Sequence, residues 1–158
     1  MIRFGLVGVG RIGKRHIEHI VHNGTLVAIC DNHLSKTAEV EEKYGCNVYT
    51  DYAEMMLAKE EFDVLAICTP NGLHAKQTIM ALRAGYHVLC EKPMALSVYD
   101  CGEMIKEAEK ANRRLFIVKQ NRYNPPVAEV KRLLDEKILG DIYSVQLNCF
   151  WNRNEGYY

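Results

Sequence analysis

Two short motifs near the start of the chain carry side chains and backbone suited to binding phosphate and ribose. Gly8, Gly10 and Gly13 form a Gly-x-Gly-x-x-Gly loop directly after an apolar segment, and Asp31 follows the next apolar segment, Leu26–Cys30. The first glycine allows a tight turn, the second lets backbone approach a pyrophosphate, and the third lets a helix pack closely on the strand. An acid about twenty residues further on can accept hydrogen bonds from a ribose diol. The pair therefore predicts a dinucleotide site.

The acid also bears on which dinucleotide binds. A carboxylate at position 31 can bind the free ribose 2′-hydroxyl of NAD and would repel the 2′-phosphate of NADP. Asn32 and His33 follow it, so no arginine stands there to neutralise a phosphate. Arg11 in the glycine loop could still favour NADP. We therefore expect NAD, with NADP as the alternative.

Two further motifs follow later apolar segments. Thr69-Pro70-Asn71 precedes His74, and Glu91-Lys92-Pro93 follows residues 86–90. Thr69 and Asn71 could bind the nicotinamide ribose or the phosphates, or simply form a turn that caps a helix. Lys92 could relay a proton to or from a substrate oxygen, or polarise a carbonyl. A lysine in a loop can equally be a solvated surface charge.

Alternating strands and helices must position these motifs. The apolar patterns predict strands at 2–7, 25–30, 47–49, 63–68, 86–90 and 114–118, and helices at 11–22, 35–44, 51–59, 72–84 and 97–111. Several strand segments are continuous apolar runs, which is typical of a parallel sheet covered on both faces. We expect a doubly wound α/β Rossmann domain over residues 1–118, with all the motifs facing one crevice at the carboxyl ends of its strands.

The pattern changes after residue 118. A polar link leads to Pro125 and Pro126, where a helix can begin, and Gly140 is expected to end that helix. Residues 141–150 then alternate like a long strand. We expect residues 119–158 to be a linker and the incomplete start of an α+β domain for substrate binding and oligomerisation. An unpaired edge on such a strand favours pairing with another chain.

Composition narrows the class of protein. The chain has 158 residues, 48% of them hydrophobic, and equal numbers of basic and acidic residues. A net charge of zero argues against nucleic acid or an anionic membrane as partner. Met1 leads straight into the first expected strand, without a signal peptide or membrane span, and the six scattered cysteines fit a reducing cytoplasm. His16, His19 and His22 have metal-compatible spacing, but no carboxylate or thiol completes a set, so no metal site is expected.

Taken in order, the motifs resemble those of the Gfo/Idh/MocA oxidoreductases, over the whole chain. The resemblance implies that Lys92 is catalytic, contacting the substrate hydroxyl or carbonyl and assisting hydride transfer. It implies that Glu91 lies beside the nicotinamide ribose and that Pro93 follows a cis peptide. The cofactor-binding set would then be Gly8, Gly10, Arg11, Ile12, Gly13, Asp31, Thr69, Pro70, Asn71, His74, Glu91, Lys92 and Gln120.

A narrower resemblance involves residues 119–125 and 149–153. These segments look like the branch that oxidises the C3 hydroxyl of UDP-N-acetylglucosaminuronic acid during surface-polysaccharide synthesis. In that setting Gln120 approaches the cofactor, and Trp151 and Arg153 approach cofactor or substrate. Trp151 could instead pack in a second-domain sheet.

The resemblance leaves other functions open and adds one reservation about this chain. Another sugar or inositol dehydrogenase, an imine reductase, or a non-enzymatic NAD-binding module remain alternatives. The family carries an Asp-x-x-x-His motif later in its second domain, and this chain ends before it. We therefore expect the chain alone to bind cofactor but to be severely impaired as a catalyst, and the full-length protein to form a homo-oligomer through the second-domain sheet.

Overall fold

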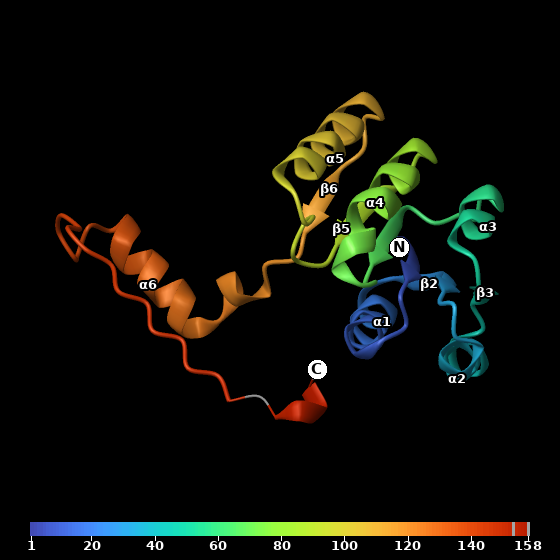
Figure 1. Ribbon diagram of the computed structural model, residues 1–158, viewed down its shortest axis with the longest axis horizontal. Helices are drawn as coiled ribbons and strands as arrows, with labels where there is room; N and C mark the ends of the chain where they lie inside the picture. Colours follow the sequence, from blue (N-terminus) through green and yellow to red (C-terminus); the bar gives the residue numbers. More distant parts are fainter. Residues whose placement is uncertain (153, 158) are drawn as a thin grey trace. The chain divides into compact units, whose positions relative to one another are not determined.

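Strands and helices alternate along about the first three quarters of the chain (Figure 1). The structure is a computed structural model that describes residues 1–152 and 154–157. The strands are β1 (Arg3–Val7), β2 (Thr25–Cys30), β3 (Asn47–Tyr49), β4 (Val64–Ile67), β5 (His87–Cys90) and β6 (Leu115–Ile117). The α-helices are α1 (Arg11–Asn23), α2 (Leu34–Tyr44), α3 (Tyr52–Leu57), α4 (His74–Arg83), α5 (Val98–Lys110) and α6 (Pro125–Asp135), with short 3₁₀ turns at Asn71–Leu73, Gln120–Tyr123 and Glu155–Tyr157.

The six strands form one parallel sheet in the order β3-β2-β1-β4-β5-β6. The strand order reverses between β1 and β4, which is the feature that opens a ligand crevice in a doubly wound sheet. The predicted doubly wound α/β Rossmann fold is confirmed. Each predicted strand up to residue 118 lies within one residue of its predicted limits at either end.

The register of the sheet aligns the ends of four strands. Val7 of β1 pairs with Cys30 of β2 on one side and with Ile67 of β4 on the other. Ile67 pairs in turn with Cys90 of β5. The glycine loop, Asp31, the Thr69 segment and Glu91 therefore all begin one or two residues beyond one aligned edge of the sheet.

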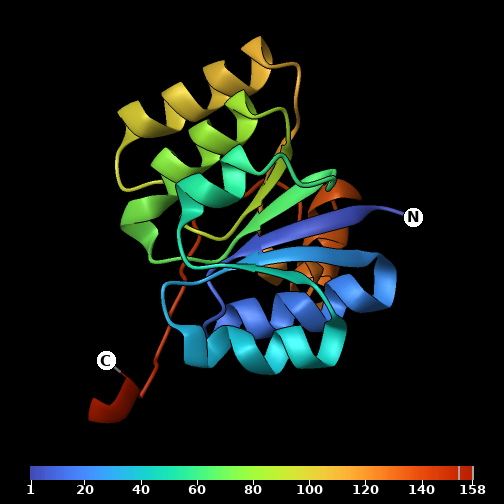
Figure 2. The same ribbon diagram turned by 90° about the vertical axis from the view of Figure 1, so that its right-hand side faces the viewer.

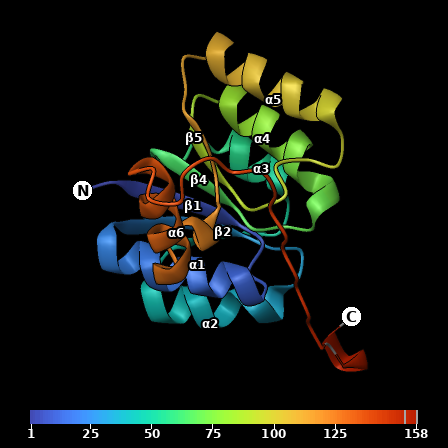
Figure 3. The same cartoon turned by 90° about the vertical axis from the view of Figure 1, so that its left-hand side faces the viewer.

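Helices cover both faces of this sheet (Figures 2 and 3). On one face α1 and α2 contribute Ile17, Ile20 and Val40 to a buried cluster with Leu6 and Ile29. The amphipathic spacing of these residues on each helix directs them to the strands.

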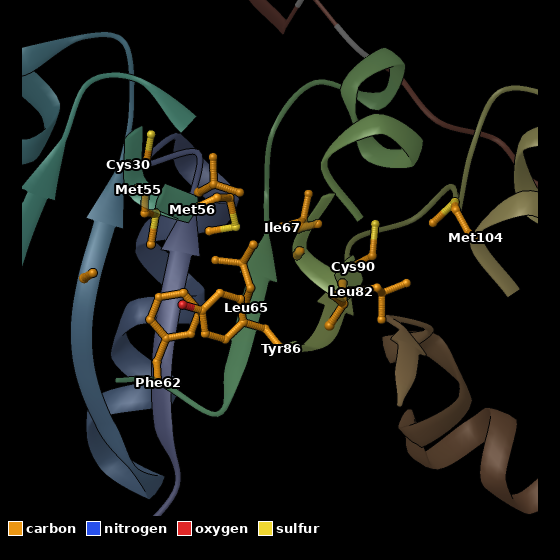
Figure 4. Close-up of a cluster of buried hydrophobic side chains, with 14 of the residues drawn as sticks. Cys30, Met55, Met56, Phe62, Leu65, Ile67, Leu82, Tyr86, Cys90 and Met104 are labelled. Carbon is orange, nitrogen blue, oxygen red and sulfur yellow. The ribbon is translucent and has the colours of Figure 1, made fainter. Parts of the chain in front are cut away.

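The opposite face carries the larger core, built from α3, α4 and α5 (Figure 4). Leu65 of β4 and Leu82 of α4 are fully buried there. The rings of Phe62 and Tyr86 stack with centroids 4.1 Å apart at the base of β4 and β5. The two cores make the sheet a rigid platform for the loops at its carboxyl edge.

Residues 120–158 form a unit of their own, separate from residues 1–119. Its helix α6 begins at Pro125 as expected, but it ends at Asp135, before Gly140. Lys137 adopts a φ of 55°, a left-handed conformation that cannot continue a helix.

The prediction of a strand over residues 141–150 is wrong, because this segment does not form a β-strand. Leu147 and Phe150 are about 90% exposed. A β-strand requires a neighbouring strand for its backbone hydrogen bonds, and the described part of the chain gives this segment none. The alternation of residue types indicated a pairing partner that the described residues do not contain.

Candidate functional site

The glycine loop is shaped by two close backbone approaches. Gly8 has a φ of +93°, and a Cβ there would lie 2.7 Å from the carbonyl of Cys68 at the end of β4. A Cβ on Gly13 would lie 1.9 Å from the carbonyl oxygen of Gly8. Only glycine fits either position, so the loop packs tightly between β1, β4 and the first turn of α1.

Gly10 has the opposite environment. No atom of the described chain lies within 4 Å of where its Cβ would be. It is the N-cap of α1, and the described residues contribute no side-chain cap there and no acidic residue in the first turn. The first intrahelical hydrogen bond runs from Lys14 N to Gly10 O at 3.0 Å, so the N–H groups of residues 11–13 have no acceptor within the helix. Together with the helix dipole, they make the start of α1 suited to binding an anion.

Asp31 is buried and held by two backbone donors. Val9 N donates to its Oδ2 at 2.8 Å, and His33 N donates to its Oδ1 at 2.9 Å. The Lys36 ammonium lies 3.8 Å from Oδ1. Each carboxylate oxygen keeps a lone pair for a further donor. The first of these bonds also links the acid directly to the glycine loop.

A cavity of about 560 Å³ lies between these groups. It is lined by the glycine loop, the end of β2 with the start of α2, the end of β4, and side chains from α3 and α4. The predicted site residues in its lining are Gly8, Gly10, Arg11, Ile12, Asp31, Thr69 and Pro70.

Three residues of the cavity lining, Thr69, Gln77 and Tyr52, are joined by hydrogen bonds that the sequence did not predict. Thr69 Oγ1 donates to Gln77 Oε1 at 2.5 Å, and Tyr52 Oη donates to Gln77 O at 2.7 Å. Burial raises the pKa of the Tyr52 phenol, which keeps it a donor at neutral pH. Neither Tyr52 nor Gln77 belongs to a recognisable motif, so only the packing of α3 and α4 brings them to the site.

His74 lies behind the cavity rather than in its lining. The side chain is fully buried at the start of α4. Its Nδ1 lies 2.7 Å from Pro93 O and its Nε2 lies 2.9 Å from Thr69 O. It therefore ties the loop after β4 to the loop after β5, and its contact with the site runs through those two loops.

Lys92 is exposed on the loop after β5, and its peptide bond to Pro93 is cis, as the family resemblance implies. The neighbouring Glu91 is buried, and its carboxylate contacts Lys92 N and His16 of α1. The contact to His16 was missed, although His16 follows Gly13 by three residues and so shares its inward-facing stripe on α1.

Gly13 and Asn71 do not belong to the lining of the cavity. Gly13 and Asn71 lie in the first turn of α1 and in the 3₁₀ turn after Pro70. Gln120 and Trp151 belong to the second unit, and Arg153 lies outside the described residues. The roles in binding of these three, and of all the other predicted site residues, stay predictions.

Other chemistries have little support at this site. Burial first, and then the carboxylates of Asp51 and Asp31, raise the pKa of the Cys30 thiol to about 12. Burial likewise raises the pKa of Cys90 to about 11, so neither thiol is a nucleophile at neutral pH. In the part of the chain that the structure describes, no group of three metal-ligating side chains occurs, and no helix has the length and apolarity to cross a bilayer.

The fold and the arrangement of the glycine loop and Asp31 around the cavity are those of a dinucleotide-binding domain. The model of the Gfo/Idh/MocA oxidoreductase family, described as having an NAD-binding Rossmann fold, matches residues 2–119. The chain belongs to this family.

Known proteins of the family are similar over most of this chain. D-glucoside 3-dehydrogenase of Escherichia coli K12 is 34% identical over 90% of the chain and 41% of its own length. The structure of the WlbA dehydrogenase from Bordetella pertussis, in complex with NADH and UDP-GlcNAcA, is 41% identical with a TM-score of 0.94, over 99% of this chain and 49% of that one. Myo-inositol 2-dehydrogenase of Lactobacillus plantarum is 30% identical with a TM-score of 0.82, over 89% and 43%. The chain thus spans less than half the length of these relatives.

The cofactor of this domain is NAD, and the residues present fit it. The N–H groups of the first turn of α1 and the helix dipole suit its diphosphate, and the space beside Gly10 leaves room for it. The fixed carboxylate of Asp31 suits the adenosine ribose diol.

Changing Asp31 to asparagine is expected to weaken NADH binding about tenfold, because an amide accepts one hydrogen bond fewer and repels one of the two backbone donors. It should also reduce the difference in binding affinity between NADH and NADPH, because the charge that repels a 2′-phosphate is removed. Fluorescence titration of both cofactors measures each effect. Asp135→Asn, on the exposed surface of α6, is the matched control. An unchanged preference for NADH would show that Asp31 does not set the specificity.

Proposed function

We propose that this chain is the cofactor-binding part of an NAD-dependent dehydrogenase that oxidises a secondary hydroxyl of a nucleotide sugar. The candidate substrate is a UDP-N-acetylglucosaminuronic acid, oxidised at C3. The observation that carries the proposal is the placement of Lys92 after β5, on the same aligned strand edge as the glycine loop and Asp31. Similarity to the Bordetella pertussis WlbA dehydrogenase over nearly the whole chain supports the substrate class.

Different residues of the chain would serve different steps of such a reaction. The start of α1 and Asp31 bind and orient the cofactor, whose nicotinamide ring accepts a hydride when bound. Lys92, on an exposed loop backed by a buried carboxylate, can accept the proton of the substrate hydroxyl as the carbon is oxidised. Gln120 is proposed to contact cofactor, and Trp151 and Arg153 cofactor or substrate, since a guanidinium suits a carboxylate or a phosphate. In the full-length protein we propose that the second domain also forms a homo-oligomer.

A pair of hybrid enzymes tests the substrate class. Residues 1–158 would replace the matching segment of the Bordetella pertussis WlbA dehydrogenase in one hybrid, and of the Lactobacillus plantarum myo-inositol 2-dehydrogenase in the other. Each is assayed by NADH absorbance with UDP-N-acetylglucosaminuronic acid or myo-inositol. We expect the first hybrid to retain at least about tenfold more of its parent's kcat than the second. The reverse ranking would favour an inositol dehydrogenase.

A non-enzymatic NAD-binding module is the second candidate. It would use the glycine loop and Asp31 without any need for Lys92. Two folded hybrids that bind NADH but turn over neither substrate would favour this reading.

A further inference from the structure

His16 makes a contact between two segments that lie far apart in the sequence. It is on α1, three residues after Gly13, and its side chain is only 14% exposed. Its Nε2 lies 2.9 Å from Oε1 of Glu91, whose side chain is 8% exposed. A buried carboxylate requires hydrogen-bond donors, and the imidazole N–H is one of them.

Glu91 connects His16 to the loop that contains Lys92. Its second carboxylate oxygen, Oε2, accepts a hydrogen bond from Lys92 N at 3.1 Å. Its backbone N–H donates to Ile67 O of β4 at 3.0 Å. The chain of contacts therefore runs from α1, through one buried carboxylate, to the backbone of Lys92.

The strand order indicates which part of the crevice lies next to these contacts. Asp31 follows β2 and the glycine loop follows β1, so the adenosine and diphosphate lie over those strands. A dinucleotide spans the point where the strand order reverses, so its other half extends over β4 and β5. Glu91 and Lys92 follow β5, at that second half.

We propose that His16 is a positioning residue that acts through Glu91 to fix the Lys92 loop relative to the phosphate-binding helix. The proposal rests on the proposed function, since it assumes that NAD occupies the crevice. It assigns His16 to the nicotinamide half of the site, although His16 belongs to the helix that binds the diphosphate. A purely structural histidine would affect both halves alike.

The test compares NADH with ADP, because ADP occupies only the half of the site over β1 and β2. Binding of each to the whole 158-residue chain is measured by fluorescence or calorimetric titration. We expect His16→Leu to weaken NADH binding about tenfold and to leave ADP binding within about twofold of wild type. His16→Gln keeps an N–H near the position of Nε2 and should recover most of the NADH affinity. His19→Leu, on the exposed side of the same helix, is the matched control and should change neither.

Three results would overturn the proposal. These are equal losses for NADH and ADP, no loss for either, or a loss that glutamine does not recover at all. If the leucine variant does not fold, His16→Asn takes its place in the same comparison, because its shorter amide cannot reach Glu91. A wild-type chain that binds ADP but not NADH, or neither, would instead refute the proposed function and the inference with it.

Discussion

Replacing Gly13 with alanine is expected to abolish NADH binding, with at least about a hundredfold loss of affinity. The added Cβ would lie 1.9 Å from the carbonyl oxygen of Gly8, far inside van der Waals contact. The obstructing atom is backbone, so no side-chain rotation relieves the clash. Either α1 moves away from β1 or the glycine loop moves, and both movements displace the N–H groups that are predicted to bind the diphosphate. We also expect stability to fall by about 1–3 kcal/mol or more, as in overpacked cores.

Alanine substitutions at two other glycines distinguish a loss caused by disturbed packing from a loss caused by filling the ligand space. Gly10→Ala meets no atom of the described chain within 4 Å, so it should leave urea stability nearly unchanged while weakening NADH binding, because the methyl group occupies space left for the ligand. Gly102→Ala, within α5, also meets nothing and should stabilise the helix by about 0.5–1 kcal/mol without altering binding. NADH affinity and urea unfolding are measured for all three variants. Near-normal NADH binding by the Gly13 variant would contradict the role of this close packing.

Much of the fold could be predicted because each strand and helix is encoded locally. The continuous apolar run from Val64 to Ile67 and the helical spacing of Ile17 and Ile20 each identify their element without reference to distant residues. The parallel order then follows from the alternation of strand and helix, and it places Asp31 and Lys92 at one edge of the sheet. The predicted strand over residues 141–150 failed because a strand exists only with a partner, which a local pattern cannot supply.

The contacts of the site were harder to predict, because they depend on distance in space rather than in sequence. His16 lies 75 residues from Glu91. Its position on the inner stripe of α1 was visible, but its partner was not. His74 was predicted to bind cofactor, which stays a prediction, and the structure shows it fully buried between the carbonyls of Thr69 and Pro93. A motif identifies a residue that a site requires, and only the packing shows whether that residue touches the ligand or holds the loops that do.

Changing Lys92 to methionine is expected to lower kcat by about a hundredfold to ten-thousandfold in the hybrid with the Bordetella pertussis second half. Methionine keeps the length of the side chain but cannot accept or donate the proton of the hydroxyl being oxidised. Lys92→Arg keeps a positive charge, yet a guanidinium does not give up its proton at neutral pH, so it should recover little of the rate. NADH affinity should change far less than kcat, because the predicted anchors of the cofactor are the start of α1 and Asp31. Steady-state NADH formation and NADH titration of the same preparations give both quantities.

Lys76→Met is the matched control for this prediction, because Lys76 is also an exposed lysine but lies within α4. It should leave both kcat and NADH affinity unchanged. If Lys92→Met and Lys76→Met behaved alike, the lysine after β5 would be a solvated surface charge. If Lys92→Met lost NADH affinity and kcat in equal proportion, Lys92 would be a binding residue for the cofactor rather than the group that moves the proton. A loss confined to kcat separates proton transfer from both alternatives, since it removes an interaction made only as the substrate reacts.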